Sequence, residues 1–578
     1  MRKAGRTALP RQGCFFIGGA AEFAGKTQVS SRFSRFSDFR PWLENERYAS
    51  AGYLVIIKLP KKTPHLRTLR IQGEREAERA GLKKKRVLLT LAAAGMLIGF
   101  PGAARGEAVM EEKRMTTYYV DSLNGADSGD GRSPETAFQS VGRVNALRLE
   151  PGDSVLFRAG GMYSGTLEPA GTGEEGRSLT FGRYGEGPDP VLNAGGAFAA
   201  VRLRNMAYVR VSDFEITNLA PAQDAARCGV YVECGGAGTP GGIFREIHLR
   251  NLNVHDVVTV SGRTCGGIIF DTRAADHPVT YENVSIENCS VRNTRGNGIT
   301  FTSAYSKRTG IDWATEPYAP SRSVSIRNNF VYNCGGDGIF QSCAVDPVIA
   351  HNTVYGTSWA GDTAYAGIWP HNSTNAVMAY NEAYGQRLVG GDGQGYDVDI
   401  NCENTLVEHN YSHHNEGGFL LVCTSGDQGG WNRGVTVRYN ISEDDRGQIF
   451  TLSGPVTDIR LHNNTVSFRE GLNTRLIGMY QWGESGGGPD GVTAEDNIFA
   501  INGTGRNALY PDTRFRFSHN LYAGTYDCRN LDDRERIEAD PLFAGETPLY
   551  GISTGSGFNL KKGSPAKADD GTFMGARP

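Results

Sequence analysis

The fold is decided by four stretches: VSIENCSVRNTRGNGITF (284–301), VSIRNNFVYNCGGDGIF (324–340), TLVEHNYSHHNEGGFLLVC (405–423) and VTVRYNISEDDRGQIFTL (435–452). Each reads as an apolar strand, an asparagine turn, a glycine turn and a second short strand. The turn asparagine recurs at intervals of 23 to 33 residues, as Asn329, Asn352, Asn381, Asn410, Asn440, Asn464, Asn497 and Asn520. Short β runs repeating at this length indicate a solenoid, in which each coil buries its apolar face against the next. The sequence therefore predicts an all-β, single-stranded parallel β-helix.

Composition excludes two classes of function. The 578 residues carry a formal net charge of -3, without the basic excess of a nucleic-acid-binding protein. The ten cysteines are scattered and form no CxxC pair, so we expect no zinc site.

The first hundred residues differ from the rest. Lys83–Arg86 are basic, 87–100 form an uncharged apolar run, and 101–104 read Pro-Gly-Ala-Ala. This order is typical of a secretory signal peptide, which we place at 83–106, and the run is short for a membrane span. We expect a secreted protein without a membrane span in its mature form. Residues 1–82 would be a non-native or disordered extension from an over-extended start of translation; the alternative is a cytoplasmic tail before an anchor.

The remaining chain divides into three predicted parts. Residues 116–195 form an N-terminal cap and the first coils, 196–525 the β-helix coils, and 526–578 a C-terminal cap. Caps are expected because the ends of a solenoid would otherwise expose core and strand edges. Asp121, Asp127 and Asp130 could hold a calcium ion through oxygen ligands, or they could belong to a solvated loop. Loops 221–243, 305–321 and 482–490 leave the repeat and are candidate cleft walls.

The strand that follows each glycine turn can be aligned across coils, and its side chains alternate between core and solvent. Alignment on the first residue predicts inward sets such as Phe419/Leu421/Cys423 and Ile449/Thr451/Ser453. Cys402 and Cys423 then occupy the same position on neighbouring coils. We expect stacked core thiols, although secretion leaves a disulfide open.

The same alignment predicts a polar cluster on the outward face. It places Asp399 beside Trp369 and Asn401 beside His371, with Asp397 on the same face. Three further charged residues approach this face from neighbouring turns: Glu416, Arg446 and Asp392. Phe340 lies on the preceding coil.

Carboxylates on neighbouring strands repel each other and raise one another's pKa. A protonated acid beside an ionised carboxylate is the pair that cleaves glycosidic bonds. Asp397 or Asp399 would be the nucleophile or base, and Glu416 or its neighbour the acid, with Asp392 in the same group.

We expect Trp369 and Phe340 to form an apolar platform for a sugar ring. His371, Arg446 and Asn401 would bind its polar groups. The alternative is a polar sheet face with Asp and Asn capping turns; Asp337 is predicted to be such a turn residue.

From residue 116 to 578 the chain resembles the secreted right-handed parallel β-helix proteins of the pectin-lyase-like superfamily. The resemblance implies polysaccharide lyases, glycoside hydrolases or epimerases whose substrate lies along this outward face. The polygalacturonase residues (Asn-Thr-Asp, paired Asp, Gly-His-Gly, Arg-Ile-Lys) and the Asp-Pro-His of alginate epimerases are absent. A lyase base would have to be Lys307, Arg446 or Arg387.

Three functions remain in order of preference. The first is a secreted glycoside hydrolase acting on a polysaccharide or oligosaccharide as a monomer, without a cofactor. The second is a polysaccharide lyase that uses calcium and an arginine base. The third is a non-catalytic glycan-binding surface protein.

Overall fold

The computed structural model describes residues 115–360, 363–427, 429–484, 486–511, 513–545, 556–568 and 571–576. The chain divides into two units, 1–108 and 109–578, and every described residue lies in the second. The expected extension (1–82) and signal peptide (83–106) lie outside the described residues. Among those described, no helix has the length and apolarity needed to cross a membrane.

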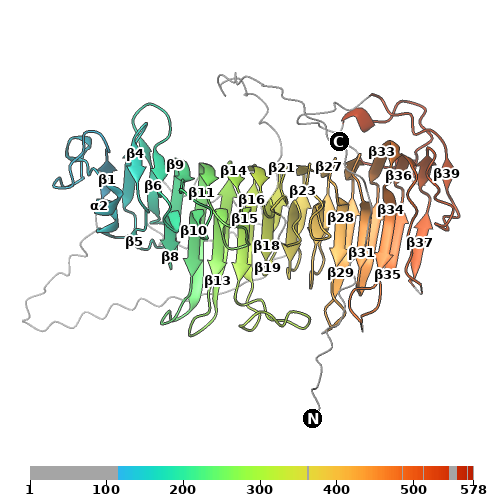
Figure 1. The fold of residues 1–578 in the computed structure, drawn as a ribbon, viewed down its shortest axis with the longest axis horizontal. Coiled ribbons are helices and arrows are strands. Elements are labelled where there is room, and N and C mark those ends of the chain that lie inside the picture. Colours follow the sequence, from blue (N-terminus) through green and yellow to red (C-terminus); the bar gives the residue numbers. More distant parts are fainter. Residues whose placement is uncertain are drawn as a thin grey trace, which may run out of the picture. The chain divides into compact units, whose positions relative to one another are not determined.

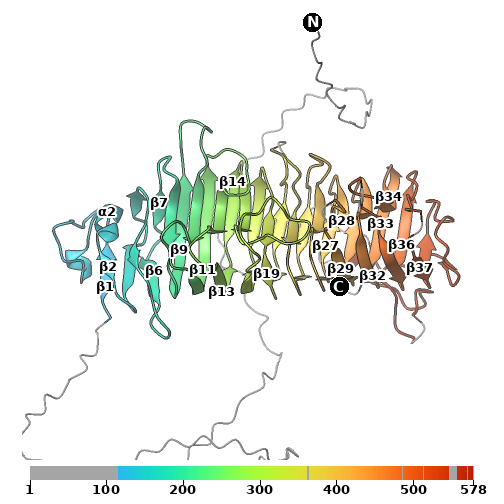
Figure 2. The same cartoon turned by 90° about the horizontal axis from the view of Figure 1, so that it is seen from below.

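The second unit is built from short strands that pair in parallel with the equivalent strands of the next coil. The coils lie side by side from the first strand, β1, to the last, β39 (Figures 1 and 2). Each complete coil contributes one strand to a ten-stranded sheet and two to a 27-stranded sheet. The predicted all-β parallel β-helix is confirmed.

The ten-stranded sheet forms one face of the helix and carries the candidate site. Its strands, in chain order, are β8 (Ala199–Arg204), β10 (Cys228–Cys234), β12 (Gly266–Thr272), β15 (Asn297–Ser303), β18 (Ile339–Ser342), β22 (Ile368–His371), β25 (Gln394–Val398), β28 (Gly418–Cys423), β31 (Gln448–Ser453) and β34 (Arg475–Tyr480).

The 27-stranded sheet bends into two ladders, which share the long strands β9 (Val209–Asn218) and β11 (Gly242–Val257). The other strands of the first ladder are β1 (Thr117–Val120), β3 (Ser154–Arg158), β6 (Leu179–Tyr184), β13 (Val279–Glu287), β16 (Ser321–Arg327), β19 (Ala344–Val345), β20 (Val348–Ala350), β23 (Val377–Ala379), β26 (Leu406–Glu408), β29 (Asn432–Arg438), β32 (Val456–His462), β35 (Asp490–Glu495) and β37 (Phe515–Ser518).

The second ladder follows the asparagine turn. Besides β9 and β11 its strands are β4 (Met162–Ser164), β7 (Val191–Asn193), β14 (Ser290–Thr294), β17 (Phe330–Cys334), β21 (Thr353–Tyr355), β24 (Glu382–Tyr384), β27 (Tyr411–His413), β30 (Ile441–Glu443), β33 (Thr465–Leu472), β36 (Ile498–Gly503), β38 (Leu521–Ala523) and β39 (Ile537–Glu538).

Small elements lie at both ends. Near the first coil are the 3-10 turn η2 (Pro134–Thr136), the helix α2 (Val141–Asn145) and the pair β2 (Arg148–Leu149) and β5 (Ala170–Gly171). Helix α2 buries its two valines in the main core. Near the C-terminus, η3 (Ser556–Phe558) brings Phe558 against Tyr411 and Ile441 of the second ladder. The tail therefore packs against coils formed more than a hundred residues earlier.

The turn asparagines form one continuous hydrogen-bonded ladder between the two strand ladders. From Asn329 to Asn520, each Nδ2 donates to the Oδ1 of the next asparagine at 2.8 to 3.0 Å. All eight side chains are buried, and Asn520 donates in turn to Asp533. A stacked amide satisfies itself through its neighbours, so the predicted structural role of these residues is confirmed.

One inward row of the ten-stranded sheet is apolar and buried. Each of its residues pairs with the next along the helix: Ile268, Ile299, Ile339, Ile368, Tyr396, Leu420, Phe450 and Ile477. The predicted inward sets are correct for the earlier coils. For β28 and β31 they are correct at Phe419 and Ile449, which lie in the core. The later positions are wrong by one residue, because Leu420, Val422, Phe450 and Leu452 occupy the paired core rows.

Glycine position explains this error. In the earlier coils a glycine lies where a Cβ would be only 2.2 to 2.4 Å from a valine methyl of the second ladder. Gly395 continues this row beside Gly367. In the next coil Gly418 pairs with Gln394, so Phe419 stands beside Gly395. Alignment on the first glycine therefore shifts the pattern of that strand.

Candidate active site

The outward face changes character at β25. Ile368 pairs with Tyr396, and His371 forms a parallel bridge with Asp399. Asp397 is therefore level with Trp369. The expectation that Asp399 would lie beside Trp369, and Asn401 beside His371, is wrong by two residues. The shift is even, so both aspartates keep the predicted outward direction.

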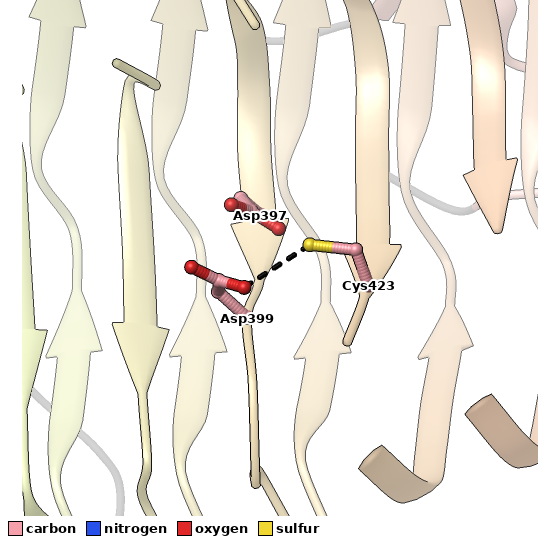
Figure 3. Close-up of side chains that lie close together, drawn as sticks. All are labelled: Asp397, Asp399 and Cys423. Carbon is pink, nitrogen blue, oxygen red and sulfur yellow. Dashed lines mark hydrogen bonds between the residues drawn. The ribbon is translucent and has the colours of Figure 1, made fainter. Parts of the chain in front are cut away.

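Asp399 follows the last residue of β25 and is half-buried. Its Oδ1 accepts hydrogen bonds from the Ile400 amide at 2.7 Å and from the Cys423 thiol at 3.1 Å. Figure 3 shows Cys423 reaching across from the neighbouring strand β28 toward this carboxylate. The carboxylate is thus held at one oxygen.

Asp397 lies one pleat before Asp399 and is only 3% exposed. Its Oδ1 has no hydrogen-bond partner among the described residues. Burial, followed by the negative charges of Asp399 and Asp392, raises the pKa of Asp397 well above its usual range. Burial therefore favours the neutral form of this carboxyl and leaves it little exposed to a substrate.

Asp392 belongs to the loop between β24 and β25, where a backbone bridge to Val389 shapes the turn. Burial, and then the charge of Asp399, raises the pKa of Asp392 to about 7, although Arg263 acts in the opposite direction. The side chain is still partly exposed. Asp392 can therefore hold a proton at neutral pH and offer it to a bound molecule.

Asp337 has more contacts than a simple turn residue would need. It is fully buried, and its carboxylate accepts four hydrogen bonds. The donors are Arg263 Nε (3.1 Å), Trp369 Nε1 (3.0 Å), the Ala366 amide (3.1 Å) and Asn297 Nδ2 (3.1 Å). Asp337 therefore fixes both a cation and an indole at the site.

Arg263 is the site residue that sequence reasoning missed. It comes from the loop before β12, and its guanidinium lies 5.5, 5.4 and 5.2 Å from the ring centres of Phe340, Tyr365 and Trp369. Burial lowers its pKa and Asp337 raises it, with a net increase, so the group stays charged. No local sequence pattern pointed to Arg263, because its hydrogen-bond partners Asp337 and Ala364 lie 74 and 101 residues away in the chain.

The Phe340 and Trp369 rings pack against each other, with their centres 4.1 Å apart, but both side chains are buried. Their role as a platform for a sugar ring stays a prediction. His371 follows on the same strand, and its Nδ1 is 2.9 Å from Ser342 Oγ. Burial lowers the pKa of His371, which favours a neutral ring. Trp313, from loop 305–321, lies 6.2 Å from that ring.

Two predicted residues have structural contacts instead, and a third has an exposed position. Asn401 is buried, donates to Thr309 O at 2.7 Å and accepts from the Trp431 amide at 3.1 Å, so it ties two loops together. Glu416 is exposed, and its Oε2 accepts from the Leu388 amide at 3.0 Å, which anchors the loop that carries Asp392. Arg446 is exposed in the next turn.

The three lyase bases considered, Lys307, Arg446 and Arg387, all have exposed side chains. The charge of Asp399 acts instead on Arg263, whose pKa it helps to raise. The predicted cysteine thiols are confirmed, since the nine described cysteines are free and buried. Cys402 lies in the core, whereas Cys423 points outward to Asp399, so the two do not share a position.

One group among the described residues could approach a metal ion: oxygens of Asp397 and Asp399 and the sulfur of Cys423 lie within 4.8 Å of one another. Calcium prefers six to eight oxygen ligands, which a thiol does not supply. Asp121, Asp127 and Asp130 instead accept hydrogen bonds from nearby backbone amides. The group at Cys423 therefore does not suit calcium, and the calcium site considered at the three aspartates stays a prediction.

Comparisons with known proteins agree with this architecture. A family model described as "Right handed beta helix region" matches residues 279–466. This chain is a right-handed β-helix. The match confirms the predicted handedness.

The sequence is 27% identical over 550 residues to a lacto-N-biosidase of Bifidobacterium longum subsp. longum, covering 76% of this chain and 33% of that protein. The chain thus spans about one third of the length of that relative.

Two solved structures of a GH136 lacto-N-biosidase from Eubacterium ramulus are also similar. The selenomethionine form has 26% identity and a TM-score of 0.55, covering 64% of this chain and 67% of that one. The native form has 25% identity and a TM-score of 0.53, covering 64% and 68%.

Proposed function

We propose that this protein is a glycoside hydrolase that acts on an oligosaccharide or polysaccharide, with Asp392 as the acid and Asp399 as the nucleophile or base. The observation that carries the proposal is the contrast between these two carboxyls. Asp392 has a pKa raised to about 7, whereas Asp399 is held by two hydrogen-bond donors on one oxygen. Glycosidic cleavage needs such a pair in opposite protonation states.

The chemistry follows from the positions of the protons. Protonated Asp392 donates its proton to the glycosidic oxygen, so that the leaving sugar departs as a neutral alcohol. Asp399 either attacks the anomeric carbon or removes a proton from the attacking water. Asp397 is enclosed, and burial raises its pKa, so it is not assigned a step in the reaction.

The aromatic residues supply binding. Trp369 and Phe340 lie on the row that carries Asp397 and are 4% and 5% exposed, so a sugar would contact only the small exposed part of this pair. The Trp369 indole N–H donates to Asp337. A fixed indole loses little conformational entropy when a sugar ring packs against it. The similarity to lacto-N-biosidases favours an activity of that kind on a glycan.

The test compares Asp399→Asn and Asp392→Asn with the wild-type protein on a chromogenic lacto-N-bioside and on a panel of glycans. Asp399→Asn should lower kcat/KM by about 10³-fold or more on every substrate. Asp392→Asn should lose as much on a sugar leaving group but little on a nitrophenol leaving group, which departs without protonation.

Glu416→Gln is the matched control, because it keeps an oxygen that can accept from Leu388 and removes only a charge. It should retain nearly full activity. Full activity in both Asp variants would exclude the proposal. An unsaturated, ultraviolet-absorbing product would establish a lyase instead, and binding without product would establish a glycan-binding protein.

A further inference from the structure

Cys423 occupies an unusual position for a buried cysteine. It is the last residue of β28 and only 4% exposed, yet it points outward, since the residue before it, Val422, packs in the core. The outward row to which it belongs joins neighbouring strands by side-chain hydrogen bonds. Thr302 donates to Asp271 at 2.8 Å, and Ser342 meets His371 at 2.9 Å. Cys423 and Asp399 continue this pattern at the site.

The Cys423 sulfur can donate only while it carries its proton. Burial, followed by the charges of Asp399 and Asp397, raises the pKa of the thiol well above its usual range. Buried Asp397, whose Oδ1 is without a partner among the described residues, has a ligand oxygen within 4.8 Å of both other groups. Burial thus favours the neutral forms of both groups beside Asp399.

The Asp399 side chain accepts two hydrogen bonds from the described residues, both at the same oxygen. The Ile400 amide and the Cys423 thiol approach Oδ1 at 2.7 and 3.1 Å. Oδ2 receives none from the described residues, so its lone pairs are free for a substrate or a water molecule. Two donors from different directions also fix the rotation of the carboxylate.

We propose that Cys423 is a positioning residue for Asp399: its thiol pins Oδ1 and leaves Oδ2 as the reacting oxygen. This inference rests on the proposed function of Asp399. A thiol is a weak donor, so it orients the carboxylate without withdrawing much of its basicity. A serine hydroxyl in its place would be a stronger donor, but its C–O bond is shorter than the C–S bond of cysteine.

The decisive variants are Cys423→Ala and Cys423→Ser. Loss of the donor should reduce kcat by about 10- to 100-fold with KM little changed, a loss typical of removing a residue that orients a reactive group. Cys423→Ser restores a donor and should recover most of kcat. Cys423→Val fills similar volume without a donor and should behave like Cys423→Ala, which separates hydrogen bonding from packing.

The acidic limb of the pH–kcat profile gives a readout that simple packing would not change. A hydrogen bond to the charged form lowers a carboxyl pKa, so losing it should move this limb to higher pH in Cys423→Ala and back in Cys423→Ser. The other groups around Asp399 stay the same in these variants: Asp397 and Asp392 before it in the chain, His371 on β22, and Arg263 and Asp337 from their loops.

An infrared measurement tests the contact without requiring activity. The S–H band of Cys423, isolated as the difference between the wild-type protein and Cys423→Ser, should lie at a lowered frequency and rise in Asp399→Asn. An active enzyme whose Cys423→Ala variant keeps wild-type kcat and an unshifted limb overturns the role of Cys423 alone. An inactive wild-type enzyme that retains the Asp399-dependent band overturns the proposed function while the contact stands.

Discussion

The asparagine corner and the outward face of the ten-stranded sheet are built on the same coils but obey different rules. At the corner, eight successive coils place the same amide in the same contact, and each polar atom is satisfied by the next coil. On the outward face, one row reads Thr300, Phe340, Trp369, Asp397 and Leu421. Repetition stabilises the fold, whereas its interruption gathers buried carboxyls that a purely structural face would not contain.

The largest expected effect breaks the regular region. Asn410→Ala removes bonds to Met378 O, Asn440 Oδ1 and the Asn381 amide and side chain, and leaves their buried partners unsatisfied. We expect the free energy of unfolding to fall by about 4 kcal/mol, measured by urea denaturation. Thr493→Ala, a half-buried change elsewhere on the helix, should cost within about 0.5 kcal/mol. Equal losses in the two variants would show that the ladder adds nothing.

The next effect weakens the irregular region. In Asp337→Asn an NH₂ group replaces the oxygen that accepts hydrogen bonds from Arg263 and Asn297. Those two donors then lie against another donor and lose their hydrogen bonds. We expect a loss of about 3 kcal/mol in stability and a higher KM, because Trp369 and Arg263 lose their anchor. Asp346→Asn, at an exposed turn with the same chemical change, is the control. An unchanged KM would separate Asp337 from the binding surface.

A third prediction concerns a buried carboxyl away from the site. Burial raises the pKa of Asp445 to about 6, despite the hydroxyls of Ser412 and Ser442 that donate to it. A raised folded-state pKa stabilises below the unfolded value of about 4, and this contribution is lost as pH rises through about 6. Asp445→Asn should therefore be about 2 kcal/mol more stable than the wild-type protein at pH 8 and nearly equal to it at pH 4.5. Thermal denaturation across this range provides the measurement; a constant difference would contradict it.

The smallest effect sharpens the assignment of the acid. Because Asp392 must be protonated to donate, kcat/KM should fall about tenfold per pH unit above a pH of about 7. Asp392→Asn should remove this limb along with most of the activity, and Asp445→Asn should leave it in place. A limb that persists in Asp392→Asn would assign the acid to another group.

Much of the site could be predicted because alternation along a strand is a local property. The sequence indicated that Asp397, Asp399, Trp369, His371 and Phe340 share the outward face, and the paired strands bear this out. It did not give the register, that is, which residue of one strand lies beside which residue of the next. The register depends on where Gly395 packs against the second ladder. Glu416 and Asn401 have the right neighbourhood but serve as loop anchors.

The protonation states also required the structure. Asp397 and Asp399 are two residues apart and look equivalent in sequence, yet one is 3% exposed and the other half-buried. Burial raises the pKa of Asp397, since desolvation disfavours the charged form. The same holds for Asp337, which has the Gly-Asp-Gly context of a turn and the surroundings of a buried anion.

The sequence by itself determined the solenoid, the asparagine ladder and the coils at which the repeat is interrupted, because stacking of like on like leaves a periodic trace in the chain. Only the tertiary structure decided register, protonation and the contributions of Arg263, Asp337 and Cys423. These residues act across 24 to 101 positions of sequence, through contacts set by how successive coils meet. No local sequence pattern encodes such contacts, since the two partners come close together only after the coils have stacked.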